Sequence, residues 1–278
     1  MNYFFLKSAE IRLQVSVFQR SVIDLWYFFL MNAWSCTFPV LIFALLAITQ
    51  KFQLPWLPRY DWLLIFILII QWIFIKIKFE THDELKVIVL FHLMGLCMEI
   101  FKVWKGSWSY PEPGFTKIGG VPLYSGFMYA CVAGYMCQAW RKMELKLVGF
   151  VPHYWGLAVA VAIYLNFFTL HFVVDLRYFL ALLAILIYRS VDVQFKLKTA
   201  TYQIPMLLAF VLIGFFIWLA ENVATFFGAW KYAYQHENWQ AVSTQKLGSW
   251  ILMVIVSFII VAELKHFKAD HQPKPKSY

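Results

Sequence analysis

The sequence predicts an all-α fold, a multi-pass transmembrane helical bundle of about eight spans built as two parallel four-helix repeats. Three observations predict it. Of 278 residues, 62% are hydrophobic and only 14% are charged, which leaves too little polar surface to cover a soluble globule. Long apolar stretches recur along the whole chain, and one short pattern occurs twice at a fixed offset of 122 residues.

The apolar stretches give the candidate spans. A helix needs roughly 20 apolar residues to cross the hydrocarbon core of a bilayer. The stretches that meet or approach this length cover residues 24–48, 61–78, 84–103, 121–140, 154–174, 176–190, 203–227 and 247–265. Stretch 176–190 is the shortest of the eight. The chain is therefore expected to be an integral membrane protein.

The chain ends are expected to lie outside the spans. Residues 1–20 mix charged with aromatic side chains and have no small-residue cleavage site, which favours an interfacial helix over a cleaved signal peptide. Residues 269–278, with two prolines and two lysines, are expected to form a disordered cytoplasmic tail. The four cysteines all fall within predicted spans, so we interpret them as small apolar core residues without disulfides.

The net charge of +9 is interpreted as membrane topology and not as a nucleic-acid interface, because the basic residues are spread over short loops and the tail. With a cytoplasmic N-terminus, sixteen of the 24 lysines and arginines fall on the inner side. The positive-inside rule then favours both termini in the cytoplasm. We expect a multi-pass protein of the bacterial cytoplasmic (inner) membrane.

The repeated pattern is Glu-x6-Gly-x-Trp-x-Tyr, and both copies end a long apolar stretch. Its residues are Glu99, Gly106, Trp108 and Tyr110 in the first copy and Glu221, Gly228, Trp230 and Tyr232 in the second. Because each unit of four spans contains an even number of crossings, the second unit enters the membrane from the same side as the first, and the units are parallel. We expect repeat 1 at 21–145 and repeat 2 at 146–268.

The two carboxylates are the main candidates for catalysis, because a charge inside a bilayer costs roughly 2.5 to 3.5 kcal/mol even on insertion scales and usually faces a functional path. Glu99 has Lys102 three residues away, so a local ion pair is the alternative to a catalytic role. Glu221 has no basic residue at the matching spacings, which makes it the more informative of the two.

Further candidates lie at the same depth. His171 and Asp175 are spaced to share one helical face, where an aspartate can orient an imidazole for proton transfer or simply cap the helix. The aromatic residues of the pattern are typical either of an interfacial belt or of a cavity mouth. The predicted substrate-binding residues are His92, Trp108, Tyr110, Trp230, Tyr232 and Asn222.

Several enzyme classes lack their signatures in this sequence. There are no closely spaced histidine boxes, no Asp-rich diphosphate motif, no lysine in the middle of the seventh or eighth span, and no Gly-rich phosphate loop. We therefore predict no cofactor and no metal site. Any chemistry is expected to use carboxylates, histidine, tyrosine and tryptophan.

The residues also carry a family resemblance. The strings Gly106-Ser107-Trp108-Ser109-Tyr110-Pro111-Glu112 and Trp218-Leu219-Ala220-Glu221-Asn222-Val223 resemble the bacterial multi-pass membrane family called domain of unknown function 817. The resemblance covers nearly the whole chain and implies no activity. A looser likeness is to tandem-repeat membrane carotenoid cyclases and hydratases, from which the loop after Gly106 departs.

Three hypotheses of function follow. The first is a membrane-embedded enzyme that uses Glu99 and Glu221 as general acid and base on an isoprenoid or other lipid. The second is a small proton-coupled transporter or permease, and the third is a non-catalytic accessory protein. The lipid bilayer is the expected partner, nucleic acid is not expected, and the oligomeric state is left open.

Overall fold

The computed structural model describes residues 2–52, 54–149 and 153–271, of which 2–17, 153 and 265–271 are described by their backbone alone. The helices are α1 (Asn2–Ser35), α2 (Thr37–Lys51), α3 (Arg59–Lys76), α4 (His82–Trp104), α5 (Gly126–Lys142), α6 (His153–Thr169), α7 (Arg177–Tyr188), α8 (Met206–Phe226) and α9 (Lys246–His271). The short elements are β1 (Lys117–Ile118), β2 (Val121–Pro122), β3 (Lys146–Val148), β4 (Asp192–Lys196) and β5 (Thr201–Pro205), with 3-10 turns η1 (Leu123–Ser125) and η2 (Ala233–Gln235).

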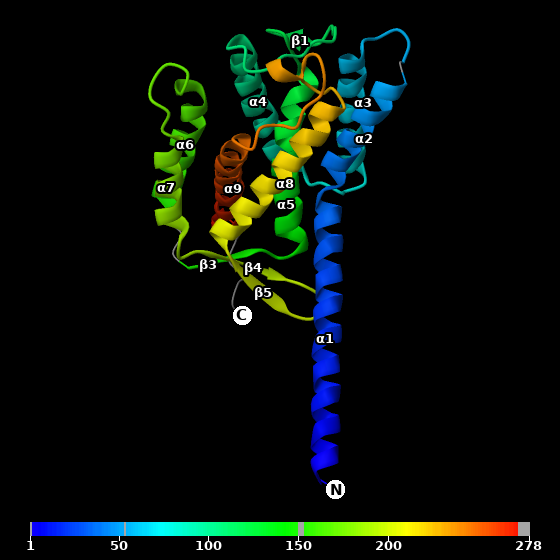
Figure 1. Cartoon of the computed structure of the whole chain (residues 1–278), viewed down its shortest axis with the longest axis vertical. Helices are drawn as coiled ribbons and strands as arrows, with labels where there is room; N and C mark the ends of the chain where they lie inside the picture. The colour runs from blue at the N-terminus through cyan, green and yellow to red at the C-terminus, as the bar shows by residue number, and fades with distance from the viewer. Residues whose placement is uncertain (1, 53, 150–152, 272–278) are drawn as a thin grey trace.

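The helices form one bundle around a central group of α4, α5, α8 and α9 (Figure 1). Helix α4 packs along α5, helix α8 packs along α9, and α5 and α9 touch each other in the centre. Helices α6 and α7 cover α9, while α2 and α3 lie on the other flank, and α1 extends away from the bundle (Figure 1). We call the end that carries Gly106 and Gly228 the motif end, and the end that carries β3 to β5 the sheet end.

Local sequence explains where the helices begin and bend. Thr81 and Glu84 form a capping box at the start of α4, in which each side chain accepts a hydrogen bond from the other residue's backbone N–H. Between α1 and α2 the chain breaks at Cys36 and turns by 59°. Pro39 explains the break, because its ring would clash with the carbonyl four residues earlier in a continuous helix.

A three-stranded antiparallel sheet in the order β3-β4-β5 closes the sheet end (Figure 1). Asp24 of α1 ties α1 to the turn between β4 and β5, since its carboxylate accepts from Thr199 N at 2.8 Å and from the Tyr202 hydroxyl at 2.9 Å. A two-stranded hairpin, β1-β2, lies at the motif end. These strands show that the prediction of an all-helical fold is wrong in the connections, although it is right for the bundle.

Every predicted apolar stretch overlaps a helix over most of its length, the first with the bent pair α1 and α2. Within the described residues, α4, α8 and the part of α9 from Lys246 to Leu264 are long and apolar enough to cross a membrane, and the bent pair Phe18–Ser35 with Thr37–Lys51 makes a fourth. Helices α6 and α7 are apolar but shorter. The chain is therefore an integral membrane protein with three or four helices that meet the length and composition of a span.

The two chain ends differ from expectation in extent. The predicted interfacial segment 1–20 continues without a break into α1, which is one helix from Asn2 to Ser35. Helix α9 continues to His271, and the rest of the predicted tail lies outside the described residues. Cys131 and Cys137 are buried, as predicted for core residues, and Cys36 is partly buried, but Cys97 is exposed and is not a core residue.

Candidate functional site

Both copies of the repeated pattern fold into the same closed loop. Helix α4 ends at Trp104, the chain reverses at Gly106 with a φ of 71°, and the Tyr110 hydroxyl returns to donate to Glu99 Oε2 at 2.7 Å. Such a positive φ is the conformation that glycine adopts without strain. The spacing of the pattern is therefore the length of a loop that brings a tyrosine back to the carboxylate.

The second loop repeats this geometry after α8. Gly228 has a φ of 65°, and the Tyr232 hydroxyl donates to Glu221 Oε1 at 2.6 Å. The two loops also bind each other, because Ser109 N donates to Lys231 O and Lys231 N donates to Ser109 O, both at 2.9 Å. Ser109 and Lys231 occupy the same position in their respective copies of the pattern.

Glu99 is buried, with an exposed fraction of 5%, and accepts three hydrogen bonds. Trp108 Nε1 and the Tyr110 hydroxyl donate to Oε2, and the Tyr129 hydroxyl of α5 donates to Oε1, each at 2.7 Å. Gly95, one helical turn before Glu99, makes room for Tyr129, since a Cβ there would lie 2.5 Å from the tyrosine ring. Helix α4, its loop and α5 are thus joined at one carboxylate.

Glu221 is equally buried, at 4% exposed, but it accepts two hydrogen bonds. The Tyr232 hydroxyl donates to Oε1 and Trp250 Nε1 of α9 donates to Oε2, both at 2.6 Å. A carboxylate offers about two acceptor sites on each oxygen. Each oxygen of Glu221 therefore keeps one acceptor site, whereas Glu99 Oε2 is fully used.

The two carboxylates line one cavity of about 190 Å³ between the central helices. Apolar and aromatic side chains form much of its wall, including Met98, Met128, Phe167 and Met253. A basic group lies at the motif end of the same cavity, and we call it the basic rim; it consists of Lys102, His171, Arg177 and Lys246.

The contacts of the basic rim decide one alternative and correct one prediction. The alternative of a local ion pair between Glu99 and Lys102 is not what the structure has, because Lys102 Nζ donates to His171 Nε2 at 2.8 Å. The prediction that His171 and Asp175 share a helical face is wrong, since α6 ends at Thr169 and both residues lie in the connection between α6 and α7. Asp175 instead binds the Arg177 guanidinium at 2.6 Å.

The ionisation of the two loop residues follows from these contacts. Partial loss of hydration and the ammonium groups of Lys102, Lys105 and Lys246 hold the pKa of His171 below its ordinary value. The hydrogen bonds that Arg177 donates hold the pKa of Asp175 below its ordinary value. At neutral pH the histidine is thus neutral and accepts from Lys102, and the aspartate is ionised.

The predicted aromatic residues lie in the cavity wall and not at a water interface. Trp108, Tyr110, Trp230 and Tyr232 all line the cavity, and the last three are less than 9% exposed. The belt interpretation is therefore wrong for these three, because belt residues face the membrane surface.

His92 and Asn222 lie outside the residues that line this cavity. His92 packs against Phe127, with ring centroids 4.3 Å apart. Asn222 is structural: its Oδ1 accepts from Val242 N at 2.8 Å and its Nδ2 donates to Trp218 O at 2.8 Å.

The polar and aromatic residues of the site that sequence reasoning missed include Tyr129, Trp250, Lys246 and Ser125. Tyr129 and Trp250 carry the signal that was available, because they lie 121 residues apart, one short of the offset of the pattern. Lys246 is the first residue of α9, and its Nζ lies over the rings of Trp108 and Tyr232 at 5.2 and 4.8 Å.

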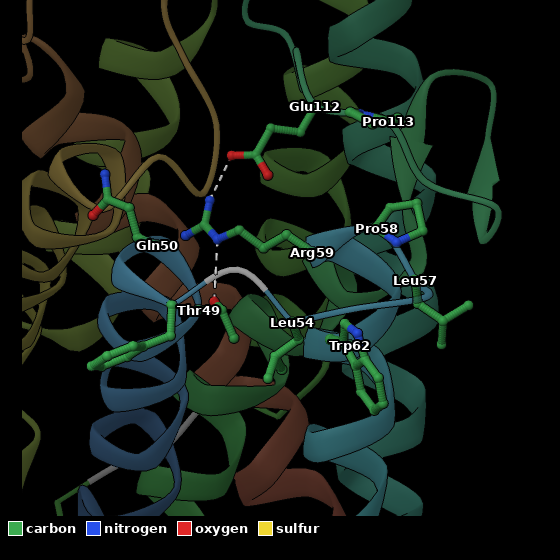
Figure 2. Close-up of a pocket in the computed structure, with 10 residues that line it drawn as sticks. Thr49, Gln50, Leu54, Leu57, Pro58, Arg59, Trp62, Glu112 and Pro113 are labelled. Atoms are coloured by element: carbon green, nitrogen blue, oxygen red, sulfur yellow. Dashed lines mark hydrogen bonds and ion pairs between the residues drawn. The ribbon is translucent and has the colours of Figure 1, made fainter.

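A second, larger cavity of about 330 Å³ lies at the motif end, away from the two carboxylates. Figure 2 shows Arg59 at its centre, between Thr49 and Glu112. Arg59 donates to Glu112 Oε1 at 2.7 Å and to the carbonyl oxygens of Phe227 at 2.6 Å and Leu46 at 3.0 Å. Because these bonds join α2, α8 and the loop after α4, we assign Arg59 a structural role.

The loop from Gly106 to Gly120 is held over this end of the bundle by α3. The Asp61 carboxylate of α3 accepts from Phe115 N at 2.9 Å and from Thr116 N at 2.8 Å. Among the described residues, no group of three or more His, Cys, Asp or Glu side chains is placed to hold a metal ion.

Comparison with known proteins agrees with the resemblance of the motifs. Residues 24–258 match the model of the family described as "Protein of unknown function (DUF817)". The chain belongs to this family. It is also similar to "Uncharacterized protein YoaT" of Bacillus subtilis (strain 168), with 53% identity over 255 residues, which cover 92% of this chain and 97% of the relative.

Two solved structures have a similar arrangement. One is a mycobacterial Insig homologue, MvINS from Mycobacterium vanbaalenii, with a TM-score of 0.49, 11% identity, and coverage of 70% of this chain and 98% of that chain. The other is a cross-linked MvINS trimer, with a TM-score of 0.48, 12% identity and the same coverage.

Proposed function

We propose that this protein is a membrane-embedded acid–base enzyme that acts on an isoprenoid or another lipid in the cavity between its two halves. One observation carries the proposal: Glu99 and Glu221, which occupy matching positions of a repeated pattern, line the same buried cavity. Two carboxylates on one apolar cavity are a common arrangement for moving a proton to and from a bound substrate.

The roles of the two carboxylates follow from their hydrogen bonds. Glu221 is the proton acceptor, because both of its oxygens keep a free acceptor site beside the cavity. Glu99 is the second acid–base group, held in place by three donors. The indole and phenol rings in the wall have electron-rich faces that stabilise a cation formed when an isoprenoid double bond is protonated.

We also propose that the chain is a duplicated unit of eight spans in the bacterial cytoplasmic membrane, with both termini inside the cell. Shifting the bounds of α4 by 122 residues gives 204–226, against Met206–Phe226 for α8. The reciprocal bonds between Ser109 and Lys231 are the kind of contact that a two-fold axis produces between equivalent residues. The excess of lysine and arginine on the inner side supports the orientation.

The transporter alternative has less support from the helices beside the carboxylates. Many transporter sites lie where a helix is broken in the middle of the membrane. Helices α4 and α8 continue through Gly95 and Gly214 without a break. His171 and Asp175 are not assigned catalytic roles, because they bind Lys102 and Arg177 and do not bind each other.

Comparison of membrane lipids tests the proposal. Lipids are extracted from cells that lack the gene and from the same cells complemented with the wild-type protein, Glu221→Gln or Glu237→Gln. Glu237 is exposed in the loop after η2, so its variant is a control for expression and charge loss. We expect at least one lipid or isoprenoid to change on deletion, and to return with the wild type and Glu237→Gln but not with Glu221→Gln.

Two other outcomes of this experiment contradict the proposal. An unchanged lipid profile in cells with and without the protein contradicts the enzyme. Full restoration by Glu221→Gln, at wild-type protein level, contradicts its role as proton acceptor and leaves the two carboxylates as structural anchors of an accessory protein.

A further inference from the structure

The basic rim of the cavity holds two ammonium groups that no carboxylate neutralises within ion-pair distance in the described part of the chain. Lys102 is only 7% exposed, and its Nζ donates to the neutral ring of His171 at 2.8 Å. Lys246 lies over the two aromatic rings of Trp108 and Tyr232. A buried cation without a counter-ion is unfavourable, so such groups usually mark a binding site for an anion.

The neighbours of Lys102 increase this cost. The charges of Lys246 and Arg177, both positive, act on its ammonium group more strongly than the opposing charges of Asp175 and Glu99. Glu221 is the strongest negative charge acting on Lys246, yet it lies beyond ion-pair distance and its hydrogen bonds come from Tyr232 and Trp250. Positive charge therefore predominates around Lys102, and an anion bound between the two ammonium groups would offset it.

A second observation also points to a ligand in this cavity. The side chain of Ser125, at the start of α5, lines the cavity wall and is only 1% exposed, yet its Oγ has no hydrogen-bond partner among the residues that the structure describes. Buried polar groups are nearly always hydrogen-bonded, and the exceptions call for a partner that binds there. The wall of the same cavity also includes Met98, Met128 and Met253, and methionine is a side chain that adapts to flexible ligands.

We propose that the cavity binds an amphiphile with an anionic head group, a carboxylate or a phosphate, which lies between Lys102 and Lys246 while its hydrocarbon chain lies against Met98, Met128 and Met253. This inference rests on the proposed function, because it names the class of substrate for the same cavity. Arg177 contributes less to the charge of the site, since Asp175 neutralises it and its Nη1 donates to Ser249 Oγ at 3.2 Å.

Binding of four probes tests the proposal. The full chain is placed in nanodiscs of phosphatidylcholine, and equilibrium binding is measured for oleate, oleyl phosphate, oleyl alcohol and inorganic phosphate. The first three share one hydrocarbon chain and differ in the charge of the head group, while the last is an anion without a chain. We expect the two anionic amphiphiles to bind at least about tenfold more tightly than the alcohol, and inorganic phosphate to bind far more weakly than oleyl phosphate.

Two single variants locate the head group. Lys102→Gln and Lys246→Gln are each expected to weaken oleate binding about tenfold and to leave oleyl alcohol binding unchanged. Lys142→Gln is the control, because Lys142 ends α5 at the sheet end and is exposed. Thermal melting in detergent checks that each variant is folded, and Lys102→Arg is expected to keep oleate binding since it keeps the charge.

Each contrary result overturns a defined part of the proposal. Equal affinity for oleate and oleyl alcohol, or unaltered oleate binding in both lysine variants, overturns the anionic head group. Equal affinity for inorganic phosphate and oleyl phosphate overturns the amphiphile in favour of a free anion. The binding site and the proposed reaction can fail independently. If the wild type converts no lipid but Glu221→Gln still binds oleate, the proposed reaction is contradicted while the proposed binding site stands.

Discussion

The two halves of this protein carry the same carboxylate on the same loop, but they use it differently. Glu99 accepts three hydrogen bonds from a tryptophan and two tyrosines, while Glu221 accepts two, from a tyrosine and a tryptophan. The bond that both halves share is the one from the tyrosine of the loop. The repeated pattern thus encodes the closed loop, and each carboxylate also accepts one bond from a neighbouring helix, from Tyr129 of α5 or from Trp250 of α9. The extra bond on Glu99 comes from Trp108 of its own loop, whose counterpart Trp230 makes no such bond to Glu221 among the described residues.

The neighbouring helices differ because the glycines of α4 and α8 lie at different positions. Gly95 lets the ring of Tyr129 approach α4 one turn before Glu99. In α8 the glycine is Gly214, where a Cβ would lie 2.6 Å from Ile251. Close helix contact therefore occurs nearer to the carboxylate in the first half than in the second.

Removing each carboxylate gives the largest expected effect on the comparison. Glu99→Ala leaves three buried donors without a partner and Glu221→Ala leaves two, and each such donor costs about 1 to 3 kcal/mol. We expect Glu99→Ala to lower the free energy of unfolding by about 3 kcal/mol or more, and by more than Glu221→Ala does. Chemical unfolding in detergent micelles measures both, with Glu237→Ala as the exposed control. A larger loss of unfolding free energy for Glu221→Ala than for Glu99→Ala contradicts this expectation.

The halves also differ at the sheet end, where Glu80 precedes α4 and the matching position, Tyr202, lies in β5. Burial raises the pKa of Glu80 to about 7, against the hydrogen bond that Gln71 donates to it. The native state thus holds this proton more tightly than the unfolded chain, whose ordinary pKa is 4.5. The stabilisation is complete below pH 4.5 and is lost as the pH rises from 4.5 through 7.

From this shift we expect Glu80 alone to cause a loss of about 3 kcal/mol in the free energy of unfolding as the pH rises from 4.5 to 8. The midpoint of thermal unfolding, measured over this range in one detergent, is expected to fall less steeply in Glu80→Gln than in the wild type. Glu144→Gln is the control, because Glu144 is exposed at the same end. Parallel pH profiles for the wild type and Glu80→Gln contradict the assignment.

The smallest expected effect comes from a matched pair of glycines at the starts of α5 and α9. A Cβ on Gly126 would lie 2.5 Å from the His92 carbonyl oxygen, whereas a Cβ on Gly248 would meet nothing within 4 Å. We expect Gly126→Ala to destabilise the protein by about 1 to 3 kcal/mol through overcrowding. Gly248→Ala is expected to be neutral or to stabilise by about 0.5 to 1 kcal/mol, because alanine favours a helix. Equal melting temperatures for Gly126→Ala and Gly248→Ala would contradict the expected difference between the two glycines.

The helices and the loop were predictable from sequence because each depends on nearby residues. The lengths of the apolar stretches predicted the bounds of α4 and α8 to within three residues. The fixed offset of the pattern identified the two carboxylates, their loop tyrosines and the equivalence of the two loops. Tyr129 and Trp250 were not predicted as partners, because their contacts depend on how closely α5 approaches α4 and α9 approaches α8. That distance depends on side-chain packing between helices, which sequence periodicity does not reveal.

The errors near the cavity have a similar cause. Treating the fifth span as helical to residue 174 placed His171 and Asp175 on one face, but α6 ends at Thr169 and each side chain finds a charged partner elsewhere. The spacing along α4 left an ion pair between Lys102 and Glu99 open as an alternative, but Lys102 donates instead to His171 in the connection between α6 and α7. The strands β3 to β5 were missed since the segments are short and join residues 146–148 to residues 192–205.

The junction between the two loops has a consequence for how such a chain arises. Ser109 and Lys231 are joined by backbone groups alone, so the junction places no requirement on either side chain, and a serine faces a lysine there without loss. Under the proposed duplication, each half would be free to change its side chains at this junction without losing the backbone bonds that join the two loops.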